Sequence, residues 1–452
     1  MSFHENYFIS YPDIRHPLSA ESLDLKLKYI TLIEYYRQQV CPTNRSVQNR
    51  FERFKRDFLS ESGYSNPDMD SSIKAIMKTR FTPFRFFSYR YVFLFDCLYI
   101  LSVDGFDHVQ KIGNLMKGSV NKRYHKKIDY ILEKILSDPS ALSSIQMITP
   151  EMIQSLMDAQ EFLATKEKSV VFTATMSAGK STLINAIIGR PLAKTKKAAC
   201  TAAITEFCSC PVSHPRCNVF LGDKEERDLM PLEVRSTAYN GAKPLTVTSF
   251  FNARVNKHKL RVIDTPGVNS SQNPIHKEIT RNELQSRHHD LIVYVIPVEN
   301  YGGEDDFIHL QFIKNNAQFG KIIFVVNMMD SCDFEDDSVD EILMDIRSHL
   351  ETIGYLEPII CPLSVKAGLL FKRALSNSEL TQSERKDLNA FCLKFADPDY
   401  DMGRFGKLRG EDVFCEEWHP SEGLHRDHIL QLYYRTGLPQ FESAILDAIE
   451  EE

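Results

Sequence analysis

The pattern of hydrophobic and polar positions changes near residue 160. Between residues 72 and 165, apolar residues recur at helical spacing, which predicts the helices Ser71–Thr79, Phe86–Ser102, Lys122–Ser137 and Pro150–Lys166. Residues 1–60 are polar and aromatic without a clear period. We therefore predict an α-helical N-terminal domain over residues 1–160.

From Ser169 onward, short β-rich runs alternate with helical runs. The predicted strands are Val170–Thr173, Ala203–Cys208, Asn218–Leu221, Leu245–Val255, Leu260–Asp264, Leu291–Ile296, Ile322–Val326 and Ile359–Leu363. The predicted helices are Lys180–Ile188, Ile275–Arg287, Phe307–Asn315 and Val339–Ile353, with further helices in residues 376–452, the last at Pro439–Glu450. This alternation predicts an α/β domain over residues 161–452, with a mostly parallel sheet flanked by helices. A ligand of such a sheet binds at the carboxyl ends of the strands.

Composition narrows the class of protein only a little. Of the 452 residues, 43% are hydrophobic and 25% charged, as in ordinary globular proteins. The net charge of -7 disfavours adhesion to nucleic acid, so no nucleic-acid partner is expected. The ten cysteines lack a regular spacing and no apolar leader opens the sequence, which predicts reduced thiols and a cytoplasmic location. No transmembrane helix is predicted.

A phosphate-binding loop is predicted where the first strand of the second domain meets the following helix. The string ATMSAGKS occupies residues 174–181. Main-chain N–H groups of such a loop converge on a β-phosphate, Lys180 would reach the β- and γ-phosphates, and the Ser181 hydroxyl would bind Mg²⁺. Ala174 stands where a glycine is usual, which a negative φ accommodates. The predicted phosphate ligands are Ala178, Gly179, Lys180, Ser181 and Thr182.

Two further segments would contact the γ-phosphate and the metal. A predicted strand ends in the string DTPG, so Asp264 can hold Mg²⁺ through water and the Gly267 N–H can meet the γ-phosphate. Loss of that phosphate would release the loop that follows. In the string CTAAIT at residues 200–205, a threonine can close over the γ-phosphate and Mg²⁺. Thr201 is the first choice and Thr205 the alternative, although both also favour the start of a strand.

Two more loops would select the base. An apolar strand ends in the string NMMD, whose Asp330 can accept hydrogen bonds from guanine N1–H and the exocyclic amine. Adenine lacks this pair of donors, so the carboxylate would stay unpaired against ATP. Asn327 would tie the loop to the phosphate loop, and Met328 stands where a lysine is usual. A later strand leads to main-chain donors for guanine O6 and a lysine over the base: Ser364, Val365 and Lys366.

Taken in order, these motifs resemble the GTPase domain of the bacterial dynamin-like proteins, a branch of the phosphate-loop GTPases. MSAGKSTLINAIIGRPL resembles their phosphate loop, CTAAIT and DTPGVN their two switches, and NMMD and PLSVKAG their base loops. TGLPQFESAILDAI resembles the helix that closes their GTPase domain. The resemblance covers roughly residues 150–452. It implies Mg²⁺-dependent binding and slow hydrolysis of GTP, with a conformation or assembly that depends on the nucleotide.

The resemblance also implies catalytic roles and partners. Ser177 would stabilise transition-state charge, directly or through a bound monovalent cation, Lys180 would bind the phosphates, and Thr201 would position the attacking water. The family needs no glutamine in the second switch, where Val268 stands in this sequence. Its GTPase domains often pair across the nucleotide. The implied partners are therefore a second copy of the domain or another dynamin-like chain.

The resemblance leaves the architecture and two alternative functions open. Family members usually carry a helical stalk and a membrane-touching tip after the GTPase domain, whereas this sequence ends with the closing helix. We expect a partner chain or the N-terminal domain to supply such helices, with a location in the cytoplasm or at a membrane surface. One alternative is a nucleotide-sensing assembly or scaffold subunit with negligible hydrolysis. Another, a phosphate-loop ATPase or kinase, is disfavoured by Asp330.

Three other segments invite a functional interpretation. The aromatic-rich Phe81–Tyr99 is interpreted as a core helix with Asp96 at its edge, rather than as a membrane-inserting helix, because its aromatics occupy all faces. The acidic residues 330–337 are interpreted as a solvated loop rather than a calcium loop. Candidate zinc ligands cluster at Cys208, Cys210, His214 and Cys217. Their spacing matches no common zinc module, so buried cysteines are the preferred interpretation.

Overall fold

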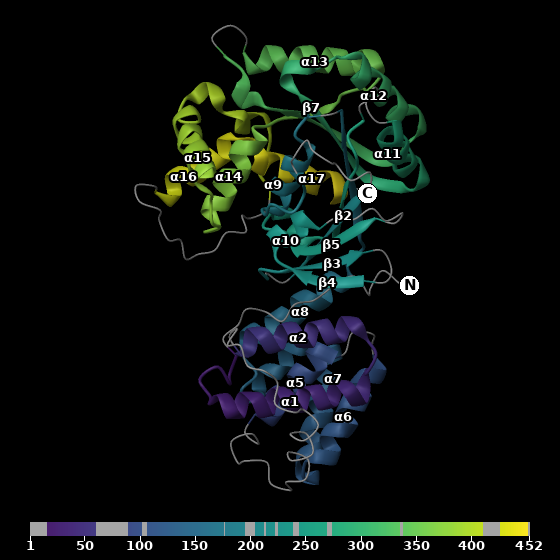
Figure 1. Cartoon of the computed structure of the whole chain (residues 1–452), viewed down its shortest axis with the longest axis vertical. Helices are drawn as coiled ribbons and strands as arrows, with labels where there is room; N and C mark the ends of the chain where they lie inside the picture. Colours follow the sequence, from purple (N-terminus) through teal and green to yellow (C-terminus); the bar gives the residue numbers. More distant parts are fainter. Residues whose placement is uncertain are drawn as a thin grey trace. The chain divides into compact units, whose positions relative to one another are not determined.

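The computed structural model describes residues 16–59, 89–101, 106–175, 177–194, 204–211, 214–221, 225–237, 244–268, 274–334, 338–409 and 425–450. The chain divides into two compact units, one of residues 1–164 with 211–214 and one of residues 165–210 with 215–452. Figure 1 shows the first in purple and blue and the second in teal to yellow. The boundary predicted at residue 160 falls inside helix α8, Pro150–Ala164.

The described part of the first unit is helical. Its elements are α1 (Leu23–Val40), α2 (Arg45–Leu59), α5 (Arg90–Leu101), α6 (Phe106–Ser119), η2 (Lys122–Tyr124), α7 (His125–Ser137), η3 (Pro139–Ser144) and α8. Neither α1 nor α2 is predicted from the sequence. In α1 the helical stripe is hidden because Glu34 and Arg37 are buried as an ion pair among apolar residues. The predicted helix Ser71–Thr79 lies outside the described residues.

Helix α5 carries the described part of the aromatic-rich segment. Every residue from Tyr91 to Leu101 is buried, as a core helix requires. Asp96 is also fully buried, so its predicted place at the edge is wrong. Its carboxylate accepts a hydrogen bond from the Tyr29 hydroxyl and lies 3.0 Å from His16 Nε2, and these partners offset the cost of burying it. Residues 81–88 lie outside the described part.

In the second unit, the described strands form one nine-stranded sheet in the order β4-β3-β5-β2-β6-β1-β7-β8-β9. Pairing is parallel from β6 through β1, β7 and β8 to β9, and between β2 and β5, whereas β2–β6, β3–β5 and β3–β4 are antiparallel. The predicted α/β class with a mostly parallel sheet is confirmed. The strands are β1 (Lys168–Ala174), β2 (Thr205–Cys210), β3 (Cys217–Leu221), β4 (Glu225–Leu229), β5 (Leu245–Phe250), β6 (Leu260–Asp264), β7 (His288–Pro297), β8 (Gln318–Asn327) and β9 (Ile359–Pro362).

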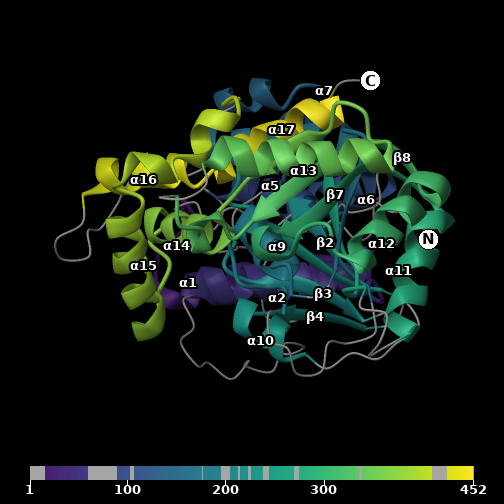
Figure 2. The same ribbon diagram turned by 90° about the horizontal axis from the view of Figure 1, so that it is seen from above.

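Helices cover the sheet in two groups. Their bounds are α9 (Lys180–Ile188), α10 (Pro231–Ser236), α11 (Pro274–Ser286), α12 (Glu304–Asn316), α13 (Val339–Ile353), α14 (Val365–Leu375), α15 (Gln382–Lys394), α16 (Arg426–Arg435) and α17 (Leu438–Glu450). In Figure 2, α11 and α12 lie on one side of this unit and α14, α15 and α16 on the opposite side. Successive β1 residues accordingly belong to different cores, Phe172 to one and Val171 to the other.

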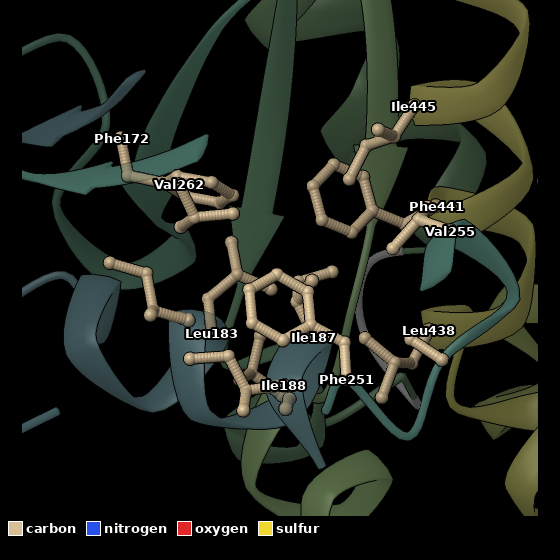
Figure 3. Packing of buried hydrophobic residues seen from close by; sticks show 14 of the residues in the cluster. Phe172, Leu183, Ile187, Ile188, Phe251, Val255, Val262, Leu438, Phe441 and Ile445 are labelled. Atoms are coloured by element: carbon tan, nitrogen blue, oxygen red, sulfur yellow. The ribbon is translucent and has the colours of Figure 1, made fainter. Parts of the chain in front are cut away.

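The core that contains Phe172 also contains side chains of α9, the helix that follows the predicted phosphate loop. Figure 3 shows Leu183 and Ile187 of α9 gathered with Phe172 of β1 and with Phe441 and Ile445 of α17. All five side chains are at most 1% exposed. Helix α9 is therefore held in place by packing on β1, in a core to which α17 also contributes.

Some elements differ from the sequence predictions. The strand predicted over Leu245–Val255 ends at Phe250, and a 3-10 turn, η4 (Arg254–Lys257), follows. Strand β4 has the sequence EERDL, which shows no apolar alternation because the strand lies at the edge of the sheet. By contrast, α9 and α13 have the predicted bounds.

The burial of two histidines predicts that the second unit loses stability in mild acid. Burial lowers the pKa of His289 to about 4 and that of His309 to about 3. In the unfolded chain both protonate near pH 6.5, so between about pH 6.5 and 4 the unfolded state binds more protons. The free energy of unfolding therefore falls as the pH is lowered through this window, by about 2 kcal/mol for each histidine at pH 5. Urea unfolding at pH 7 and pH 5 measures the change.

The variant His309→Gln isolates one of the two contributions. Its unfolding free energy should fall between pH 7 and pH 5 by about 2 kcal/mol less than that of the wild type. The comparison with wild type is needed because burial raises the pKa of Asp306 and Glu283, which acts in the opposite direction. An equal fall in both proteins would contradict the assignment of His309 as a buried neutral group.

Candidate nucleotide-binding site

The turn between β1 and α9 contains two residues with a positive φ. Ser177 and Gly179 have φ values of +69° and +87°, in the left-handed region. A Cβ at Gly179 would also lie 2.2 Å from Asn327 Nδ2, so only glycine fits there. Ala174 is the last, fully buried residue of β1, and its carbonyl accepts from the Val268 N–H at 3.1 Å. An alanine is thus accommodated as extended backbone.

Lys180, Ser181 and Asp264 meet at the carboxyl end of the central strands. The Lys180 ammonium contacts Asp264 Oδ1, and Ser181 Oγ lies 3.4 Å from Asp264 Oδ2. The side chains of Lys180 and Asp264 are only 10% and 14% exposed. The two motifs are brought together because β1 and β6 are parallel neighbours, with Phe172 opposite Asp264. A hydroxyl and a carboxylate at this separation are oxygen donors that fit Mg²⁺.

The loop after β6 is fixed to its surroundings at its first residues. Thr265 Oγ1 donates to the Phe172 carbonyl at 2.8 Å, and Thr280 Oγ1 of α11 donates to the Pro266 carbonyl at 2.8 Å. Gly267 follows directly and is half-buried. These contacts hold the predicted γ-phosphate donor beside the phosphate loop.

Asn327 links the phosphate loop to the two loops predicted to bind the base. Its Nδ2 donates to the Ala178 carbonyl at 2.9 Å, and its Oδ1 accepts from the Val365 N–H at 3.2 Å. The residue is only 4% exposed at the end of β8. One buried amide therefore sets the spacing between the loops that would hold the phosphates and the base.

Asp330 and Ser364 also lie together, at the ends of β8 and β9. Ser364 Oγ donates to Asp330 Oδ1, and the Met329 N–H donates to the Leu363 carbonyl at 3.2 Å. Met328 turns the chain between the end of β8 and Asp330, with a φ of +68°. The carboxylate predicted to recognise guanine is thus oriented by the neighbouring base loop.

Comparison with known proteins agrees with this geometry. Residues 170–329 match the model of the dynamin family. The chain contains a dynamin-family GTPase domain. No curated protein matches the sequence significantly.

Solved structures that resemble the chain include two from an oligomerised bacterial dynamin pair described as sensing and tethering membranes at long range. The first is 16% identical over 83% of this chain and 68% of its own, with a TM-score of 0.35. The second is 14% identical over 86% and 59%, with a TM-score of 0.36. Toc33 from Arabidopsis thaliana, solved with GDP and Mg²⁺, is 16% identical over 44% and 71%, with a TM-score of 0.27.

The other predicted residues of the phosphate loop and the first switch differ in exposure, and one of them lies outside the described part of the chain. Ser177 is exposed in the phosphate loop, while Ala178 is buried and Thr182 half-buried. Thr201 lies outside the described residues. Its alternative, Thr205, begins β2 directly opposite Asp264 in the antiparallel register. Thr205 therefore stays a candidate for the role proposed for Thr201.

The lysine of the second base loop is on the surface of the domain. Lys366 is 58% exposed, and its Nζ lies 2.8 Å from Asp387 Oδ2 of α15. The sequence does not indicate this contact. It also does not indicate two further contacts on the loop after β8, residues 328–334, which is the first of the two predicted base loops. Lys394 donates to the Asp330 carbonyl at 2.6 Å, and Tyr400 donates to the Cys332 carbonyl at 2.9 Å.

The candidate zinc ligands are not arranged around a metal position. Within the described ranges, no three His, Cys, Asp or Glu residues are placed to hold an ion. Cys208 and Cys210 are buried on β2, Cys217 Sγ lies 3.5 Å from Ser249 Oγ, and His214 is hydrogen-bonded to Asp57. In the same ranges, no helix has both the length and the apolar character to cross a bilayer.

Proposed function

We propose that the chain binds GTP at the carboxyl ends of β1, β6, β8 and β9 and hydrolyses it to GDP and phosphate. The observation that carries the proposal is the meeting of Lys180, Ser181 and Asp264 within one bonded cluster. The base loop with Asp330 is tied to that cluster through Asn327. The membership of residues 170–329 in the dynamin family supports the same activity.

The phosphates would be held by a cation and by main-chain donors. Lys180 would exchange its contact with Asp264 for the β- and γ-phosphates, while Ser181 and Asp264 would hold Mg²⁺, which neutralises phosphate charge when bound. Gly267 would donate its N–H to the γ-phosphate. The main-chain donors of the phosphate loop would be those of Ala178, Gly179, Lys180, Ser181 and Thr182.

The base would be held by one carboxylate and the second base loop. Asp330 would accept from guanine N1–H and the exocyclic amine, and Asn327 would keep its loop in register. Ser364 and Val365 would offer main-chain donors to guanine O6. To do so, their N–H groups would have to exchange their present acceptors, the Thr436 carbonyl at 3.1 Å and Asn327 Oδ1 at 3.2 Å. Lys366 would likewise have to leave Asp387 to cover the base.

Hydrolysis would proceed by attack of water on the γ-phosphorus. The water oxygen bonds to phosphorus, the bond to the β–γ bridging oxygen breaks, and the products are GDP and inorganic phosphate. Ser177 would face the charge that develops on the bridging oxygen, directly or through a monovalent cation. Thr201 would position the water.

The proposed assembly is a pair of GTPase domains. The partner would be a second copy of this chain or another dynamin-like chain, and a membrane surface is the third proposed partner. A nucleotide-dependent change would begin in the loop after Gly267, because the residues before it are bonded to β1 and α11.

Turnover measured against protein concentration tests this function. We expect slow GTP hydrolysis with a dissociation constant in the micromolar range or weaker, and a turnover per molecule that rises with protein concentration as the domains pair. The assay is run with and without lipid vesicles, with Lys180→Ala as the inactive control. Binding of GTP without turnover at any concentration would contradict hydrolysis.

That last result would favour a second function, a nucleotide-sensing assembly or scaffold subunit. The observation that favours it is Met328, whose apolar side chain stands in a left-handed turn of the base loop where the usual lysine would add a charge. Sustained turnover by the purified chain alone would count against the sensing role.

A further inference from the structure

The base loop of residues 328–334 is held by side chains from a later segment of the chain, and most of the loop and all of that segment lie beyond the family match. Residues 170–329 match the family model, whereas α15 and the turn η7 (Pro398–Tyr400) follow later. Lys394, the last residue of α15, donates from Nζ to the Asp330 carbonyl at 2.6 Å. Tyr400 donates from its hydroxyl to the Cys332 carbonyl at 2.9 Å. Two carbonyls of the loop are thus held from outside it.

The two side chains support each other. The Lys394 ammonium lies 4.6 Å from the centroid of the Tyr400 ring, within the range of a cation–π contact. Both side chains are half-buried, so the lysine is only partly hydrated. A charged donor to a carbonyl in such a place is worth more than a neutral one.

The C-terminus of α15 is itself anchored. Arg435 of α16 donates to the Phe395 and Ala396 carbonyls at 2.8 and 3.0 Å. Phe395 is fully buried and packs edge-on against Phe371 of α14, with ring centroids 6.1 Å apart. Lys394 therefore reaches the base loop from a rigid support, as accurate positioning requires.

The contact falls on the residue whose carboxylate would select guanine. Fixing the carbonyl of Asp330 fixes the plane of the following peptide, while Ser364 Oγ holds its carboxylate. The loop also contains Met328 at a φ of +68°, a conformation that non-glycine residues avoid unless their surroundings impose it. The carbonyls that Lys394 and Tyr400 hold belong to Asp330 and Cys332, which follow shortly after Met328.

We propose that Lys394 is a positioning residue for guanine recognition. Resting on the proposed function, the inference is that Lys394 holds the base loop so that the Asp330 carboxylate meets both guanine donors. It also places a positive charge beside this loop, where Met328 carries none. Lys394 thereby sets base selectivity from the end of α15, supported by Tyr400.

The test compares GTP with inosine triphosphate, which lacks the exocyclic amine. Dissociation constants with Mg²⁺ are measured for the wild type, Lys394→Met and Lys394→Arg. The selectivity ratio is the dissociation constant for inosine triphosphate divided by that for GTP. A displaced carboxylate loses its bond to the amine, so Lys394→Met should weaken the binding of GTP about ten-fold and that of inosine triphosphate about two-fold. The selectivity ratio therefore falls. Lys394→Arg, which can still donate to the carbonyl, should restore most of the ratio.

Controls separate positioning from simple stabilisation. Lys386 is exposed on the same helix, so Lys386→Met should leave both affinities at wild-type values. If Lys394→Met does not fold, Tyr400→Phe decides, because it removes the donor to the Cys332 carbonyl and keeps the ring. The selectivity ratio must fall in that variant.

The outcomes distinguish this inference from the proposed function. A wild-type chain that does not bind GTP would defeat the proposed function itself. A wild type that prefers GTP, with an unchanged selectivity ratio in a folded Lys394→Met or in Tyr400→Phe, would overturn only the role of Lys394. Equal weakening of both nucleotides would likewise overturn it.

Discussion

Replacing Lys180 with alanine is expected to abolish detectable GTP binding. The variant loses the cation that would contact two phosphates, and it also leaves Asp264 without the ammonium that contacts its carboxylate. Asp264 is only 14% exposed, so its charge would repel an incoming triphosphate with little screening. Truncating one partner of such a charge pair costs about 4 kcal/mol, or roughly a thousand-fold in affinity.

Equilibrium titration with a fluorescent GTP analogue measures this loss. The exposed Lys386 provides the matched control, because Lys386→Ala removes the same charge away from the site. Thermal unfolding of both variants establishes that they are folded. Wild-type affinity in Lys180→Ala would show that the loop between β1 and α9 does not hold the phosphates.

Replacing Asp330 with asparagine is expected to change the base preference of the site from guanine to xanthine. The carboxylate accepts two hydrogen bonds, whereas an amide accepts one and donates one. Xanthine keeps the N1–H donor of guanine but carries a carbonyl oxygen in place of the exocyclic amine, so it matches the amide. GTP affinity should fall by about a hundred-fold or more, while xanthosine triphosphate should bind more tightly than to the wild type.

The ratio of the two dissociation constants is the quantity to measure. Asp333→Asn makes the same chemical change at an exposed position of the same loop, and it should leave the ratio at its wild-type value. A loss of GTP binding in Asp330→Asn without any gain of xanthosine triphosphate would indicate a structural role for Asp330 instead of base recognition.

The parts of the fold that the sequence predicts are those with local causes. Helix α9 has its predicted bounds because a left-handed glycine precedes it and another ends it, at Gly179 and Gly189. The central strands are recognisable because their carboxyl-terminal parts are buried on both faces and therefore form apolar runs. Helix α2 is missed although its phenylalanines recur at helical spacing: Phe51, Phe54 and Phe58.

The residues of the candidate site also fall into those that local sequence reveals and those that it does not. Lys180, Asp264 and Asp330 can be found from sequence because each sits in a short string at a strand end, and parallel strands bring such ends together. Lys394 cannot be found, because it contacts a carbonyl 64 residues away, and main-chain acceptors leave no mark on the sequence. The exposure of Lys366 likewise depends on Asp387, in a helix whose packing the sequence does not determine.

Calorimetric titration of the wild-type chain with GTP, GDP and ATP in the presence of Mg²⁺ tests the central claim most directly. We predict saturable heat with one nucleotide per chain for GTP and GDP, and none for ATP at the same concentrations. Folded protein that gives no heat with either guanine nucleotide, or the same heat with ATP, would contradict guanine-nucleotide binding at the site of Lys180 and Asp330.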